Sequence, residues 1–110
     1  MPETVRAIIV DPSSPHGLAV KPVELAPANP DDVTVRVTAI SLNRGEVRRA
    51  TSQGKPGDRP GWDFSGIVEQ RAANGSGPPV GSRVVGLIPS GAWAERLRAP
   101  SHAVAACPTA

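Results

Sequence analysis

The sequence predicts a mainly β fold, a partly open barrel of about seven short strands with one short helix. Thirteen prolines and eleven glycines in 110 residues interrupt the chain too often for long helices, and they favour short strands joined by turns. Runs rich in valine, isoleucine and leucine recur about every 8–12 residues, a spacing typical of sandwiches and small barrels. Glycines near the strand ends favour a barrel with tight corners, in which few strand edges are exposed.

The clearest expected strand covers residues 33–40, because hydrophobic and polar residues alternate along it. One face is expected to carry Val33, Val35, Val37 and Ala39, and the other Thr34, Arg36, Thr38 and Ile40. Further strands are expected at 5–11, 18–25, 63–71, 83–88, 92–99 and 102–107. Within one of these, Gly66 indicates a bulge or a close approach of another backbone. The short helix is expected at 44–49, with Ser41 or Asn43 as its cap.

The composition and charge are those of one globular domain. The chain is long enough for a core without disulfides, and its single cysteine, Cys107, excludes an internal one. The net charge of +2 comes from basic residues interspersed with acidic ones, and tyrosine is absent, so nucleic-acid binding is not expected. The apolar run at 7–10 is too short for a signal peptide or a membrane span. We therefore expect a cytoplasmic protein that binds no membrane.

Four short motifs follow the first strands. They are SLNRGE at 41–46, PGWDFSGIV at 60–68, VGSRVVG at 80–86 and GAWAE at 91–95. In this order they resemble the GroES-like catalytic domain of the medium-chain dehydrogenase/reductase superfamily, which includes the alcohol dehydrogenases. The closer resemblance is to the zinc-independent quinone oxidoreductase branch, and it covers essentially the whole chain.

The resemblance implies that residues 1–110 are the substrate-side domain of an NAD(P)H-dependent oxidoreductase. Such enzymes reduce quinones or α,β-unsaturated carbonyls by hydride transfer from NADPH or NADH, which carries the difficult chemistry. The resemblance also implies a homodimer at full length and a nucleotide-binding Rossmann domain after the barrel. The sequence has no G-x-G-x-x-G fingerprint, so we expect that domain to be absent from this chain. The isolated 110 residues are then expected to be inactive.

The residues at the family's zinc positions do not suit a metal. Zinc-dependent relatives place a cysteine in the turn after the third strand and a His-Glu pair after the next glycine. Here the corresponding residues are Asn43, Trp62 and Asp63. A catalytic zinc usually takes three protein ligands from thiolate, imidazole or carboxylate groups, and among these residues only Asp63 qualifies. The four closely spaced cysteines of a structural zinc lobe are also missing, so no metal site is expected.

By the same resemblance, Asn43 is the candidate cofactor-binding residue, because its amide can both donate to a carbonyl oxygen and accept from a nicotinamide amide. Alternatively, Asn43 only caps the helix. Arg44, Trp62 and Asp63 are the candidate substrate-pocket residues. Arg44 could meet an acidic group or be solvated, and Trp62 could wall the pocket or belong to the core. Asp63 could hold Asn43 or an arginine in place, or bond at the start of its strand, whereas Trp93 is expected in the core.

Two other functions are left open by the residues. A GroES-like barrel without a nucleotide-binding partner could be a non-catalytic binding or assembly module that self-associates through an exposed apolar surface. The same half-site also occurs in enoyl reductases of lipid and polyketide synthesis. The fold alone does not separate these reactions.

Overall fold

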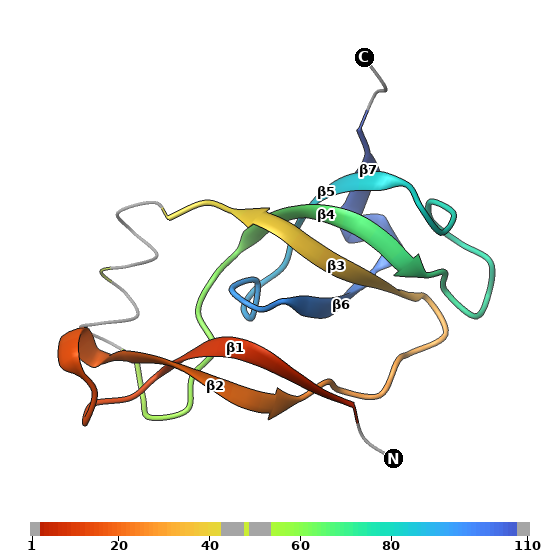
Figure 1. The fold of residues 1–110 in the computed structure, drawn as a ribbon. Helices are drawn as coiled ribbons and strands as arrows, with labels where there is room; N and C mark the ends of the chain where they lie inside the picture. The colour runs from red at the N-terminus through yellow and green to blue at the C-terminus, as the bar shows by residue number, and fades with distance from the viewer. Residues whose placement is uncertain (1–2, 43–47, 49–53, 108–110) are drawn as a thin grey trace.

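The computed structural model describes residues 3–42, 48 and 54–107, and this part of the chain is mainly β (Figure 1). It contains seven strands and two short 3₁₀ turns. The strands are β1 (Thr4–Val10), β2 (Leu18–Glu24), β3 (Asp32–Ile40), β4 (Asp63–Gln70), β5 (Arg83–Leu87), β6 (Arg96–Pro100) and β7 (Val104–Ala106), and the turns are Pro15–Gly17 and Ser101–Ala103. The helix expected at 44–49 lies outside the described residues except for Arg48, which is helical. No helix in the described ranges is long and apolar enough to cross a membrane.

The strands form two antiparallel sheets. Strands β1 and β2 make a hairpin, and the other five pair in the order β6-β3-β4-β5-β7. Figure 1 shows that the five-stranded sheet curls, with the hairpin along one side of it. The hairpin is joined to the residues before β6 by a bridge between Ala7 and Ala94 and by the amide of Ile8, which donates to the Trp93 carbonyl at 2.8 Å. These features confirm the expected partly open barrel of about seven short strands.

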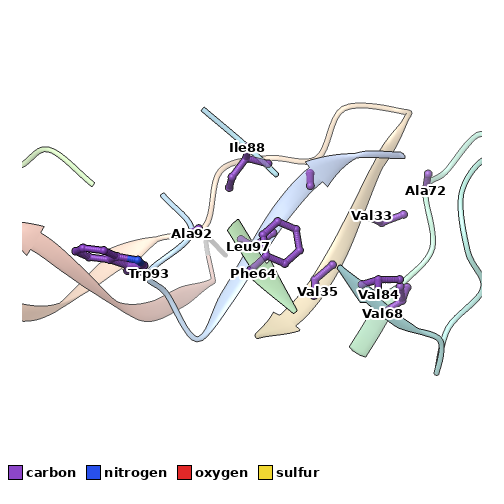
Figure 2. Packing of buried hydrophobic residues seen from close by; sticks show 11 residues of the cluster. Val33, Val35, Phe64, Val68, Ala72, Val84, Ile88, Ala92, Trp93 and Leu97 are labelled. Atoms are coloured by element: carbon purple, nitrogen blue, oxygen red, sulfur yellow. The ribbon is translucent and has the colours of Figure 1, made fainter. Parts of the chain in front are cut away.

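The hydrophobic core lies inside the curled sheet (Figure 2). Its fully buried side chains include Val33 and Val35 from β3 and Val84 from β5. Trp93 is 3% exposed and lies at the end of the cluster beside the hairpin, which confirms that it belongs to the core. Successive side chains of a strand point to opposite faces of the sheet, so the residues that alternate with the core residues lie on its outer surface.

The expected alternation along β3 is correct only in its first half. Val33 and Val35 face the core, but the register with β4 shifts between Val37 and Ala39. The shift leaves one extra residue on β3, and this reverses the alternation beyond it. Ile40 therefore packs against the core and Ala39 is exposed, the opposite of the expectation.

Gly66 lies opposite Val37 at this bulge, which confirms the close backbone approach that its position indicated. A Cβ atom on Gly66 would be 2.2 Å from the carbonyl oxygen of Arg36 and 2.7 Å from a methyl group of Val35. Only a residue without a side chain fits between the two strands here.

The last two expected strands are shorter than the sequence indicated. Strand β6 begins at Arg96, because the amides from 92 to 95 bond to several different segments and not to one neighbouring strand. Ala92 donates to the Gly61 carbonyl and Trp93 to the Pro60 carbonyl, while Glu95 donates to the Arg6 carbonyl at 3.0 Å. Similarly, a 3₁₀ turn occupies the start of the segment expected at 102–107, and the strand that pairs with β5 is Val104–Ala106.

The turn after β1 is held by the carboxylate of Asp11. It accepts hydrogen bonds from the Ser13 hydroxyl at 2.6 Å and from the Ser13 amide and the Ser14 hydroxyl, both at 3.0 Å. The Lys21 ammonium lies 3.2 Å away. These contacts, with the Ser13 hydroxyl contributing most, hold the pKa of Asp11 well below its ordinary value.

The lowered pKa of Asp11 gives a pH-dependent contribution to stability. A carboxyl group whose pKa is lowered by folding stabilises the folded state above its ordinary pKa of about 3.9, and this contribution is lost as the pH falls toward the folded-state value. We therefore expect the urea midpoint of the wild-type chain to fall more steeply below about pH 4 than that of Asp11→Asn, which has no such titration. Parallel pH profiles for the two chains would contradict this.

Candidate functional site

The candidate site begins where β3 ends and β4 starts. Ile40 pairs with Phe64, so the next residue, Ser41, lies beside Asp63, the first residue of β4. The hydroxyl of Ser41 donates a hydrogen bond of 2.5 Å to Oδ1 of Asp63. This contact joins the residue that follows β3 to the first residue of β4. It also shows that Asp63 makes a hydrogen bond at the start of its strand, one of the two roles expected for it.

Trp93 supports this pair from the core. Its indole Nε1 donates to the carbonyl oxygen of Ser41 at 3.2 Å. The ring lies so close to Gly61 that a Cβ there would be 2.5 Å from Cδ1 of the indole, and Gly61 also has a φ of +106°. The segment leading to Asp63 can therefore pass directly over the tryptophan. Trp93 thus touches both segments that carry the Ser41–Asp63 pair.

Two rows of side chains cross the outer face of the sheet at this point. Asp63 pairs with Leu87, so the first row runs from Ser41 through Asp63 to Leu87. The second row consists, in order across the strands, of Ala39, Ser65, Val85 and Ala105, so two small residues lie next to each other on β3 and β4. These residues alternate with buried ones such as Phe64 and Val84, and so they point away from the core.

A shallow hollow of about 300 Å³ lies over these rows. This volume is at the low end of the range for small-molecule sites, which is about 300–1,000 Å³. Its lining combines the polar pair with small and apolar groups: Ala39, Ile40, Ser41, Asp63, Phe64, Ser65, Val85 and Gly86. Gly86 is needed here because a Cβ would be 2.4 Å from the ring of Phe64.

A second hollow of about 300 Å³ lies between the hairpin and β3. Its charged groups, Arg6 and Glu95, pair with each other at 3.3 Å, and the Arg6 amide also donates to Glu95 at 2.7 Å. This amide and the guanidinium lower the pKa of Glu95. The pair ties β1 to the residues before β6, so we assign it a structural role and favour the hollow at Ser41 and Asp63 as the candidate site.

The expected site residues have different positions relative to this hollow. Asp63 lines the hollow. Trp62, the residue before it in the sequence, has a half-buried side chain, and its carbonyl oxygen accepts a hydrogen bond from the Ile88 amide at 2.7 Å. Asn43 and Arg44 lie outside the described residues. Sequence reasoning considered Ser41 only as a helix cap and did not single out Ser65 or Val85 for the pocket. Alternation along β4 and β5 could have placed these two on the outer face, but not next to each other.

Among the described residues that line the hollow, Asp63 is the only one of a type that binds zinc. Within the described ranges, no group of three or more histidine, cysteine, aspartate or glutamate side chains could hold a metal ion. At the positions where the zinc-dependent relatives carry ligands, Asp63 alone is suitable, and its carboxylate is bonded to the Ser41 hydroxyl.

Comparison with known proteins relates this chain to oxidoreductases. The trans-enoyl reductase milB of Cordyceps militaris is 33% identical over an alignment of 92 residues, and the match covers 78% of this chain and 25% of that protein. A probable oxidoreductase from Mycobacterium abscessus is 28% identical with a TM-score of 0.84, covering 98% of this chain and 36% of that one. The quinone oxidoreductase from Coxiella burnetii shares the fold, with a TM-score of 0.78 at 20% identity over 94% of this chain and 37% of that one.

The chain therefore spans about a quarter of the curated relative and about a third of each solved structure. The model of the alcohol dehydrogenase GroES-like domain matches residues 29–109. This match covers more than half of the chain and includes β3 to β7 and the Ser41–Asp63 pair. The chain belongs to the alcohol dehydrogenase GroES-like domain family.

Proposed function

We propose that this chain is the substrate-side domain of an NAD(P)H-dependent reductase that transfers hydride to a quinone or an α,β-unsaturated carbonyl without zinc. The observation that carries the proposal is the hollow over β3, β4 and β5, which has a fixed polar pair on one side and apolar groups on the other. Small-molecule sites commonly combine an apolar lining with a few polar groups of this kind. The family match and the similarity to oxidoreductases support the same class of reaction.

In this proposal, the chain binds and orients the substrate. Reduced nicotinamide, when bound, supplies the hydride. Asp63 holds Ser41, two residues before Asn43 in the sequence. We propose that the amide of Asn43 contacts the nicotinamide or the substrate carbonyl. We further propose that Arg44 and Trp62 border the same pocket. A polar group placed to meet the charge that develops on the carbonyl oxygen lowers the barrier without any metal.

Most of the cofactor contacts must come from another domain. A solved oxidoreductase of this fold is nearly three times as long as the part that this chain matches, since the chain covers 36% of it. We propose that a nucleotide-binding domain completes the cleft, and that the complete enzyme is a cytoplasmic homodimer.

An enoyl thioester is the second candidate substrate, and the similarity to a trans-enoyl reductase favours it. An enoyl thioester is itself an α,β-unsaturated carbonyl, so the same half-site suits it. The distinction from a quinone reductase then lies in the substrate and not in the type of hydride transfer.

The test is a comparison of the 110-residue chain with the protein encoded by the complete reading frame that contains it. We expect the complete protein, but not the isolated chain, to oxidise NADPH or NADH in the presence of a benzoquinone, an alkenone or a trans-2-enoyl thioester. Activity should be unchanged after treatment with a zinc chelator. A complete protein that reduces none of the three classes, or a frame without a nucleotide-binding domain, would overturn the proposal in favour of a binding module.

Two variants of the complete protein test the role of the polar pair. Ser41→Ala and Asp63→Asn are each expected to lower kcat by about 10- to 100-fold, because a small displacement of the reacting groups has effects of that size. Asp58→Asn is the matched control, since the Asp58 carboxylate accepts a hydrogen bond from the Lys55 amide in a loop away from the hollow. Equal activity of Asp63→Asn and Asp58→Asn would remove Asp63 from the site.

A further inference from the structure

We infer that a further cavity, between the hairpin and β6, is a binding site for a small aliphatic carboxylate, whose anion is held by the guanidinium groups of Arg59 and Arg98. The cavity has a volume of about 110 Å³ and shares no lining residue with the hollow at Ser41 and Asp63. The inference therefore goes beyond the proposed reductase function and does not depend on it.

The cavity lies where the two sheets separate. Strand β6 is at one edge of the five-stranded sheet, and the hairpin meets the residues before it through the isolated bridge between Ala7 and Ala94 (Figure 1). Strands β1 and β6 themselves do not pair, and the end of β2 and the loop at 88–91 also border the space between them. The larger apolar side chains of the lining are those of Val5, Val23, Leu25, Ile88 and Leu97.

The two guanidinium groups are held by carbonyl oxygens that are two residues apart at the end of β2. Nη2 of Arg59 donates to the Glu24 carbonyl at 3.0 Å. Nη1 of Arg98 donates to the Ala26 carbonyl, and its Nε donates to the Thr34 hydroxyl at 3.3 Å. A guanidinium has about five N–H groups, so each arginine keeps several for a ligand. These contacts place two cations beside the same cavity.

Neither guanidinium has an ion-pair partner among the residues that the structure describes. The third arginine of the lining, Arg96, is paired with Glu3 and also with Glu69, whose carboxylate is 2.8 Å from its Nε. Arg59 and Arg98 bond to neutral oxygen atoms instead, and the described lining includes no acidic residue. Both side chains are half-buried, so solvent would screen their attraction for an anion less than at an exposed site.

The size and lining of the cavity narrow the class of anion. An apolar cavity of about 150 Å³ holds one benzene molecule, so about 110 Å³ accommodates roughly four to five non-hydrogen atoms. Arginine binds carboxylate and phosphate equally well by geometry. Apart from the arginines and Ser90, however, the lining is apolar, and a phosphate would leave polar oxygens against it at a cost. A short aliphatic carboxylate can place its charge at the arginines and its methylene groups against Leu25 and Leu97.

Titration of the ¹⁵N-labelled 110-residue chain tests the site without cofactor or turnover. The probes are acetate, propionate, inorganic phosphate and the neutral propionamide, at constant pH and ionic strength. We expect propionate to bind about 10-fold or more tightly than propionamide, which has the same shape without the charge. It should bind about 2- to 4-fold more tightly than acetate, because of its added methylene group, and more tightly than phosphate. The largest amide shifts should occur at Leu25, Ala26, Gly91 and Ala94, which line the cavity.

Matched arginine substitutions locate the site. Arg59→Gln and Arg98→Gln are each expected to weaken propionate binding about 5-fold or more, because each removes one of the two charges. Arg71→Gln is the control, since the Arg71 guanidinium also donates to a backbone carbonyl, that of Gly77 at 3.2 Å, but does not line the cavity. This variant should bind propionate as the wild type does. Arg59 lies in the loop before β4, so its variant keeps the test valid if Arg98→Gln does not fold.

Equal affinity for propionate and propionamide, or equal propionate binding by Arg59→Gln and Arg71→Gln, overturns the inference. Phosphate that binds at the same residues as tightly as propionate overturns the assignment to a carboxylate. The same titration of the complete protein distinguishes a free ligand from a carboxylate side chain of the protein itself. Binding that persists there supports the free ligand, and binding that is lost there overturns it. None of these outcomes involves reductase activity, so this inference and the proposed function fail independently.

Discussion

Gly66→Ala is expected to destabilise the chain by about 3 kcal/mol or more, a large part of the 5–15 kcal/mol that usually separates folded from unfolded domains. The added Cβ would be 2.2 Å from the Arg36 carbonyl oxygen and 2.7 Å from a methyl group of Val35. The carbonyl belongs to the backbone of the paired strand and cannot rotate away, so β3 and β4 must separate locally. These two strands form the centre of the five-stranded sheet, and the core packs against them.

Urea unfolding measured by circular dichroism checks this expectation. Gly75→Ala is the control, because Gly75 has a positive φ of +79° but nothing within 4 Å of an added Cβ. Its cost should be only the strain of the left-handed backbone, about 1–2 kcal/mol. A Gly66→Ala chain that is no less stable than Gly75→Ala would show that the two strands are not as closely paired as described.

Trp93→Ala is expected to cost about 3–5 kcal/mol, as is usual when a large aromatic side chain is removed from a core. Trp93 is 3% exposed, and its ring fills the space between Gly61, the end of β3 and the hairpin. Its removal leaves a cavity and also deletes the hydrogen bond to the Ser41 carbonyl. Loss of the ring should therefore both unfold a fraction of the chain and loosen the segments that carry Ser41 and Asp63.

Trp93→Phe separates the two effects. The phenyl ring keeps most of the buried apolar surface but lacks the indole N–H, so its cost should be smaller, with about 1 kcal/mol from the lost hydrogen bond. Urea midpoints measured by circular dichroism compare the two variants, because the fluorescence of Trp93 is lost in both. A loss below about 1 kcal/mol in Trp93→Ala would place this side chain outside the core.

The sequence predicted strand positions best where hydrophobic and polar residues alternate regularly. The strand starts at Leu18, Asp63 and Arg83 agree with the structure, because proline and glycine bound these runs and hydrophobic residues recur within them. Gly66 was recognised as a place of close backbone approach for the same local reason. The residues 92–95 were wrongly included in a strand, since Ala92 and Trp93 are buried among several segments and are not paired in the sheet.

The candidate site was predictable only in part. Asp63 was singled out from its motif, and it lies in the hollow. Ser41, Ser65 and Val85 carry no individual signal, because serine and valine on a strand are common in any sheet. Their importance depends on which residues lie opposite them across the sheet.

The sequence by itself determined the mainly β fold, the family motifs and the burial of Trp93, since each follows from local composition, order or side-chain type. The tertiary structure alone decided that Ser41 bonds to Asp63, that Ile40 turns inward and that Ala39, Ser65 and Val85 share one row. The physical reason is the register: one extra residue at the bulge in β3 moves every later side chain to the opposite face. No pattern within a single strand specifies how that strand is shifted against its neighbour.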